Sequence, residues 1–128
     1  MPENMSPRAP AAYASNLAEM CRQKGLLEEA EAMARRSVAM DETFVSGWNN
    51  LGIILQESGK FEESAVCLER VAGLKPDWAQ AHNNLANTYR RQGHFDKAEP
   101  HYRRALALKP GYAEAHSNLA FLLATPPR

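Results

Sequence analysis

At 128 residues with 45% hydrophobic side chains, the chain is long enough for one domain and too short for two well-filled cores. Fifteen basic and fifteen acidic residues cancel. A balanced chain has no electrostatic footprint for phosphate backbones or anionic lipid, so neither a nucleic acid nor a membrane is expected as its partner. No segment approaches 18 apolar residues, which also argues against a membrane span.

Residues 1–9 contain no apolar stretch, so they are predicted to be a disordered lead-in and not a signal peptide. From residue 11 onward the sequence repeats itself. One step of 34 residues relates a series of leucines (Leu17, Leu51, Leu85 and Leu119) and a series of asparagines (Asn16, Asn50, Asn84 and Asn118). The period predicts a repeat array over 10–125, made of units 11–44, 45–78 and 79–112, a partial unit 113–125 and a tail 126–128.

Each unit is predicted to be a pair of helices. The first helix ends at a glycine that must take a positive φ, namely Gly25, Gly59 or Gly93. Second helices are expected over 26–39, 61–74 and 95–108, and prolines end the latter two at Lys75-Pro76 and Lys109-Pro110. Glu42 replaces that proline in the first unit, so the end of its second helix is less sharply specified. With one helix in the last unit, the sequence predicts seven helices and an all-α fold.

The residues within each unit also follow a pattern. The second unit contains Trp48, Leu51, Gly52, Leu55, Ser64, Leu68 and Pro76, and the third contains His82, Leu85, Ala86, Tyr89, Ala98, Tyr102 and Pro110. Small residues at positions 8 and 20 of each unit are expected where the two helices cross (Ala18 and Ala30, Gly52 and Ser64, Ala86 and Ala98). This pattern resembles the tetratricopeptide repeat, W-x2-L-G-x2-Y…A-x3-F…P. The resemblance covers residues 11–125 and implies a right-handed α-solenoid of about 3.5 repeats.

The resemblance also implies where a ligand binds, because the first helices of tetratricopeptide arrays line a concave groove. Amides both donate and accept hydrogen bonds, so a ladder of them can hold an extended peptide backbone. The predicted peptide-binding residues are Asn16, Asn50, Asn84, Asn118, Asn49, Asn83, Asn87, Arg90 and Arg91. The two arginines are expected to receive a carboxylate of the ligand. The alternative is structural, since asparagine at position 6 is frequent in these repeats and can satisfy neighbouring groups.

One known binding mode of the family can be compared with the sequence directly. Tetratricopeptide co-chaperones hold acidic chaperone tails with lysines, an arginine and asparagines at fixed repeat positions. Counted from the first unit, those positions hold Ser15, Glu19, Asn50, Gln80 and Asn84. Only Asn50 matches. The sequence therefore does not predict this carboxylate clamp.

No catalytic constellation is visible, so the chain is not expected to be an enzyme or to carry a cofactor or a metal. His82 and His116 occupy one repeat position 34 residues apart, where a bulky aromatic is usual, and they are predicted to pack. Cys21 and Cys67 lack a paired spacing and fall within helices, which favours free thiols and a cytoplasmic location.

The predicted function is a non-catalytic protein–protein interaction module that binds an extended peptide. Two alternatives remain open. The asparagine–leucine–alanine or glycine rhythm is similar to the repeat region of protein O-GlcNAc transferases, so the chain could be the substrate-docking part of a larger enzyme such as a glycosyltransferase. It could also be a self-assembling scaffold, a homo-oligomer that associates through the apolar residues Phe121, Leu122 and Leu123 of its last helix.

Charge is distributed unevenly, which also favours assembly. Residues 1–44 carry five basic and seven acidic side chains, residues 45–78 carry three and five, and residues 79–112 carry six and two. The chain is thus acidic early and basic late, an arrangement that would attract copies head to tail.

Overall fold

The computed structural model describes residues 8–124, which form seven helices and contain no strand within that range. The all-α fold predicted from the repeat is therefore confirmed. Most of the predicted lead-in, 1–7, and the predicted tail lie outside the described residues. Helix α1 (Arg8–Gln23) begins inside the predicted lead-in. The Arg8 Nε atom lies 2.6 Å from an Asp41 carboxylate oxygen, and this ion pair holds the first turn against the end of the next helix.

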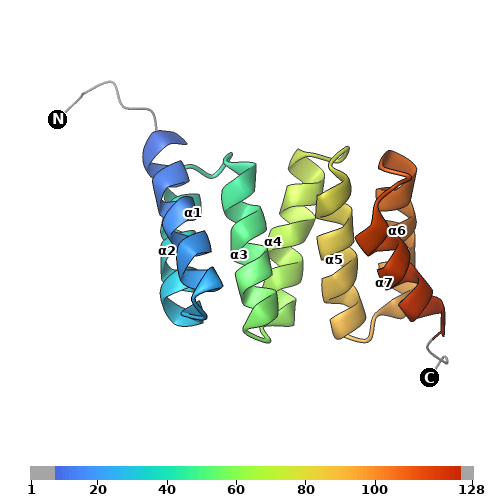
Figure 1. Ribbon diagram of the computed structural model, residues 1–128. Coiled ribbons are helices and arrows are strands. Elements are labelled where there is room, and N and C mark those ends of the chain that lie inside the picture. The colour runs from blue at the N-terminus through green and yellow to red at the C-terminus, as the bar shows by residue number, and fades with distance from the viewer. Residues whose placement is uncertain (1–7, 125–128) are drawn as a thin grey trace. The chain divides into compact units, whose positions relative to one another are not determined.

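The chain divides into two compact units, Met1–Cys67 and Leu68–Arg128, whose boundary falls within helix α4 (Figure 1). Unit 1 contains α1, α2 (Leu27–Met40), α3 (Val45–Glu57) and the first half of α4 (Phe61–Leu74). Unit 2 contains the rest of α4, α5 (Ala79–Arg91), α6 (Phe95–Leu108) and α7 (Ala113–Ala124).

The two units share one packing pattern. In unit 1, α1 packs against α2, and α3 contacts both. In unit 2, α5 packs against α6, and α7 contacts both. Apart from its part of α4, each unit therefore holds one complete helix pair and the first helix of the next repeat.

The turn inside each helix pair is closed in the same way. Gly25, Gly59 and Gly93 have φ angles of 78°, 81° and 84°, which only glycine adopts without strain. In the first turn the amide of Leu26 donates to the carbonyl of Cys21 at 2.9 Å, and the amide of Gly25 donates to that of Arg22 at 3.0 Å. This pair of bonds satisfies the last carbonyls of the first helix.

The second helices end at equivalent positions, Met40, Leu74 and Leu108, although the first unit lacks the proline. In its place Asp41 forms a local turn, because its carboxylate accepts from both the backbone N–H and the hydroxyl of Thr43, at 3.0 and 2.7 Å. The hydrogen bond from Arg8, with those from Thr43, lowers the pKa of Asp41 to about 2. The boundary expected to be poorly specified is thus fixed by side-chain hydrogen bonds.

The aromatic position 4 of the repeat fixes the loop between consecutive pairs. Trp48 Nε1 donates to the carbonyl of Glu42 at 2.8 Å. His82 Nε2 and His116 Nε2 make the same bond to the carbonyls of Pro76 and Pro110, at 2.8 and 2.7 Å. Since each acceptor is a carbonyl, the histidine nitrogen carries the hydrogen. Tryptophan and histidine are interchangeable here because both supply a ring N–H.

The core of each unit contains the small residues predicted at the helix crossings. Ala18 and Ala30 in unit 1, and Ala86 and Ala98 in unit 2, are fully buried. Between α3 and α4 the Ser64 hydroxyl donates to the Gly52 carbonyl at 2.7 Å.

Candidate functional site

Two of the four predicted ladder asparagines at position 6 bond to the preceding repeat. In unit 1, Asn50 Nδ2 donates to the hydroxyl of Ser15 at 2.6 Å. In unit 2, Asn118 Nδ2 donates to Oδ1 of Asn83 at 3.2 Å. Asn50 and Asn118 are both partly exposed, and Asn16 is exposed. Each of the two bonds uses a single amide hydrogen, so the side chain keeps further hydrogen-bonding capacity in a fixed orientation.

The predicted asparagines at position 5 are located differently. Asn83 is fully buried, and its amide also donates to the carboxylate of Glu114 at 3.2 Å. Asn49 is 5% exposed. Neither presents a usable surface to a ligand in this structure. Asn83 instead holds Asn118 in place, which is the structural role left open by the sequence.

Asn87 and Arg90, one helical turn apart on α5, converge on a buried tyrosine. The Tyr102 hydroxyl, from α6, donates to Oδ1 of Asn87 at 2.5 Å and accepts from Nε of Arg90 at 3.1 Å. Burial raises the pKa of Tyr102, so the hydroxyl stays protonated. The Arg90 guanidinium also lies 5.6 Å from the ring centroid of Phe121, on α7. Two contacts therefore hold the Arg90 guanidinium, and the bond to Tyr102 uses only its Nε hydrogen.

Unit 1 holds the equivalent arginine in an ion-pair network. Arg22 occupies repeat position 12, as Arg90 does, and its guanidinium contacts carboxylate oxygens of Glu19 at 2.5 Å and Glu57 at 2.9 Å. The hydrogen bond from Arg22 lowers the pKa of Glu19, and the one to Glu19 raises the pKa of Arg22. This charge is already neutralised by its own chain.

The histidine prediction is confirmed for His82, which is 7% exposed and stacks on His101 with ring centroids 5.4 Å apart. The two Nδ1 atoms lie 3.1 Å apart. One of these two Nδ1 atoms must donate and the other accept. Burial, together with the nearby His82, lowers the pKa of His101. His116 makes the same loop bond but is exposed.

The predicted self-association residues are divided between surface and interior. Phe121 and Leu123 are 64% and 55% exposed, whereas Leu122 is 5% exposed and belongs to the packing of unit 2. Helical geometry explains the division, since consecutive side chains point in different directions.

Some kinds of site find no support in the part of the chain that the structure describes. Residues 8–124 contain no group of three or more histidine, cysteine or acidic side chains arranged to hold a metal ion. Across the same residues, none of the helices combines the length and apolar character that crossing a membrane requires.

The repeat geometry is matched by family models. A tetratricopeptide repeat model matches residues 44–111, more than half of the chain, and a second one matches residues 11–36. The chain belongs to the tetratricopeptide repeat family. No curated protein sequence matches this tetratricopeptide chain significantly.

Solved structures extend the comparison. A mutant O-GlcNAc transferase of Thermobaculum terrenum is 25% identical with a TM-score of 0.87, and the match covers 94% of this tetratricopeptide chain and 23% of the enzyme. The predicted likeness to the repeats of such transferases is thus confirmed. The chain spans under a quarter of that enzyme's length.

Two further neighbours are peptide complexes. The first repeat domain of Spaghetti (RPAP3), bound to the HSP90 peptide SRMEEVD, is 17% identical with a TM-score of 0.88, covering 92% of this chain and 96% of that one. The second repeat domain of human RPAP3, in complex with the HSP70 peptide SGPTIEEVD, is 18% identical with a TM-score of 0.88, covering 93% and 99%. At these identities the likeness establishes a shared fold.

Sequence reasoning missed Tyr102 and Ser15 as supports of the candidate site. Tyr102 stands where the family pattern has phenylalanine, so it counted as core, and its burial is indeed complete. The departure from phenylalanine was the available signal, because a buried hydroxyl needs a partner. Ser15 carried no comparable signal.

Proposed function

We propose that this chain is a protein-interaction module that binds an extended, acidic peptide segment along its first helices. The observation that carries the proposal is the recurring bond from position 6 to the preceding position 5, Asn50 to Ser15 and Asn118 to Asn83. It holds partly exposed amides in place before a ligand arrives. Because those side chains are already ordered, binding costs less conformational entropy.

Arg90 is proposed to receive a ligand carboxylate. In the part of the chain that the structure describes, no carboxylate pairs with its guanidinium, in contrast with Arg22. Tyr102 and the Phe121 ring orient it. An arginine that is positioned but not neutralised favours a charge-assisted, two-pronged bond to a carboxylate. Arg91 follows on the same helix and is exposed.

The amides and the arginine have separate roles in this proposal. Asn16, Asn50, Asn84 and Asn118 would contact the peptide backbone, with little demand on sequence, while Arg90 would select for negative charge. Asn83 and Asn49 would act as supports. The chaperone-tail clamp is not part of the proposal, because its lysine positions hold Ser15 and Gln80.

The test is a binding series with fluorescent peptides from a random acidic library and a neutral library of equal length. We expect the acidic set to be enriched, and Arg90→Ala with Arg91→Ala to weaken a selected peptide roughly tenfold, the equivalent of about 1.4 kcal/mol. Arg103→Ala with Arg104→Ala on α6 is the matched control. Unchanged affinity in the Arg90 variant would refute the carboxylate site. A library with no binder at all would refute the module.

A second candidate function has one observation in its favour. The structural match to the Thermobaculum terrenum transferase covers 94% of this chain and 23% of the enzyme, so the chain corresponds to a small part of that protein. The alternative is that this chain docks substrates for a catalytic domain encoded in the same gene. Sequencing the gene beyond the codon for Arg128 separates the two: a transferase domain would favour the docking role, and a stop codon would exclude it.

A further inference from the structure

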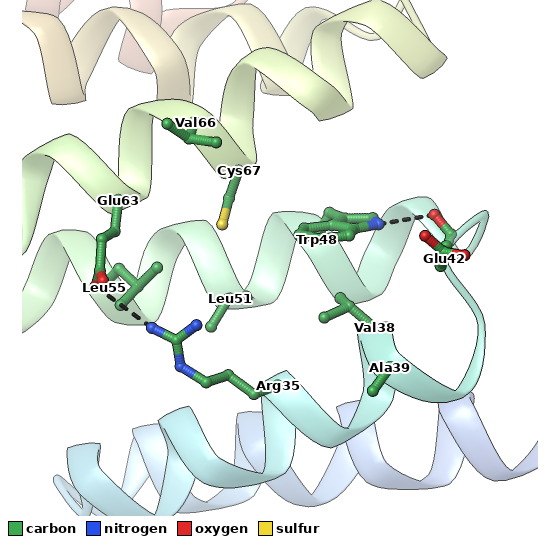
Figure 2. A pocket seen from close by; sticks show the side chains of 10 residues that line it. All are labelled: Arg35, Val38, Ala39, Glu42, Trp48, Leu51, Leu55, Glu63, Val66 and Cys67. Carbon is green, nitrogen blue, oxygen red and sulfur yellow. Dashed lines mark hydrogen bonds and ion pairs between the residues drawn. The ribbon is translucent and has the colours of Figure 1, made fainter.

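Unit 1 contains an apolar cavity that the proposed peptide site does not use. It has a volume of about 540 Å³, within the range of about 300–1,000 Å³ found for ligand pockets. Figure 2 shows that α2 and α4 form its walls and α3 its floor. The apolar lining comes from Val38, Ala39, Trp48, Leu51, Leu55, Val66 and Cys67.

Polar contacts close the two ends of this cavity. At one end Arg35 Nη2 lies 3.3 Å from a Glu63 carboxylate oxygen, and at the other the Trp48 ring donates to the Glu42 carbonyl (Figure 2). Both contacts fix side chains at the opening. The charged lining residues are two carboxylates, Glu42 and Glu63, and one guanidinium, so the opening carries a negative excess.

The inside of the cavity is strongly apolar. Cys67 points into it from α4 (Figure 2), and burial raises the pKa of its thiol to about 11. Val66 lies at the opening and is 66% exposed. Apolar walls that remain in contact with water favour occupation by an apolar group. The occupant should therefore have an apolar body and a positively charged neighbour.

Unit 2 presents such a group. Phe121 is 64% exposed on α7, and the guanidinium of Arg90 lies 5.6 Å from its ring centroid. Residues 79–112, which include Arg90, carry six basic and two acidic side chains. The Phe121 ring thus lies beside the Arg90 guanidinium in the basic, C-terminal part of the chain. The cavity, with Glu42 and Glu63 at its opening, belongs to the acidic, N-terminal part.

We propose that Phe121 of one copy inserts into the unit 1 cavity of a second copy, with Arg90 facing Glu42 or Glu63 at the opening. Because the contact joins two different surfaces, each dimer still presents one Phe121 and one cavity that the contact does not use. The assembly therefore continues head to tail. A single aromatic anchor buries less area than a stable interface needs, so association should be weak and depend on concentration.

The first test is light scattering over a concentration series of the 128-residue chain. We expect the average mass to rise from 14.2 kDa past twice that value, and high salt to oppose the rise. Phe121→Ser and Val66→Arg should each abolish it. Both positions are largely exposed, so folding should be retained. Tyr13→Ser is the matched control, because Tyr13 is an exposed aromatic (66%) outside both surfaces. A chain that stays monomeric, or a Phe121→Ser variant that still assembles, overturns the proposal.

The second test exploits the two different surfaces. Phe121→Ser retains an open cavity, and Val66→Arg retains the phenylalanine. Mixing these two non-assembling variants should yield a discrete heterodimer that grows no further. If the assembly instead used one surface against itself, the mixture would remain monomeric, and that result would contradict the proposal.

A third measurement locates the contact. In a Cys21→Ser background that keeps Phe121, alkylation of the Cys67 thiol should slow as the protein concentration rises, whereas Cys21→Ser with Phe121→Ser should show no such slowing. The same concentration dependence in the two variants would overturn the pairing of Phe121 with the cavity. These outcomes are independent of the proposed function, since peptide affinity can be measured on monomeric Val66→Arg.

Discussion

Arg22 and Arg90 occupy the same repeat position in the two units, but their guanidinium groups have different partners. Arg22 contacts Glu19 and Glu57, so unit 1 neutralises it. In unit 2 the residue equivalent to Glu19 is Asn87, and Arg90 contacts a hydroxyl and an aromatic ring. The exchange of the Glu19 carboxylate for the Asn87 amide removes one of the two carboxylates that Arg22 contacts, and Arg90 instead bonds to the Tyr102 hydroxyl. The repeat position fixes where each arginine lies on its helix, and the neighbouring side chains decide whether carboxylates neutralise it.

The largest expected effect comes from removing the tyrosine that orients Arg90. Tyr102 is fully buried, so Tyr102→Ala should lower the free energy of unfolding by about 3–5 kcal/mol, measured by urea denaturation. Tyr102→Phe keeps the ring and leaves Asn87 and Arg90 without their shared hydroxyl. We expect it to cost about 1 kcal/mol and to weaken acidic peptides. Peptide affinity equal to wild type in Tyr102→Phe would show that the hydroxyl does not position Arg90.

A second comparison concerns the packing of α2 against α3. A Cβ added at Gly47 would lie 2.9 Å from the Ser37 hydroxyl, which cannot retreat because it donates to the Ala11 carbonyl at 2.7 Å. Gly47→Ala should therefore cost about 1–3 kcal/mol. Unit 2 has buried Ala105 and Ala115 at the equivalent positions. The double variant Ser37→Ala with Gly47→Ala copies that pair and should recover most of the loss; thermal melts of both variants check this.

Exchanging the residues beside the two arginines tests the comparison directly. Asn87→Glu retains an acceptor for Tyr102 and adds the carboxylate that Arg22 has. It should neutralise Arg90 and weaken acidic peptides roughly tenfold, with little change in stability. The reciprocal Glu19→Asn should leave Arg22 with Glu57 and improve acidic-peptide binding slightly. Fluorescence anisotropy on both variants measures the effects. An improvement in Asn87→Glu would reverse the assignment of roles.

The smallest effect concerns the loops that follow the second helices. Unit 1 ends α2 with the charged Asp41, and unit 2 ends α6 with Lys109-Pro110. The folded pKa of Asp41 is about 2, below its ordinary value of 3.8, so its stabilising contribution is present above pH 4 and is lost as the pH falls toward 2. Asp41→Asn keeps an acceptor for Thr43 and should flatten that part of the pH profile. Urea midpoints between pH 2 and 5 measure it; an identical slope would contradict the assignment.

The sequence determined most of the fold because the same helix and turn signals recur every 34 residues. The glycines at Gly25, Gly59 and Gly93 marked the turns, and all three have positive φ. The second helices predicted over 61–74 and 95–108 were confirmed to the residue, and the first shifted by one. Such features depend on backbone geometry and local hydrogen bonds, which a short segment carries within itself.

The candidate site could be predicted only in part. The asparagines at position 6 are exposed or partly exposed, and their contact with a peptide stays a prediction. Position 5 looked the same in the sequence, yet Asn83 is buried between Glu114 and Asn118. Residue type does not reveal this difference, because adjacent side chains on a helix point about 100° apart and the neighbouring helix covers only one of them.

By itself, then, the sequence determined the repeat, the helix pairs, their turns and the small residues at their crossings, since each follows from spacing and backbone conformation. Only the tertiary structure decided which arginine is neutralised and which asparagines are buried. It also formed the apolar cavity between α2 and α4. Those properties arise where residues from different repeats meet. Their contacts depend on the packing of whole helices, which no local pattern encodes.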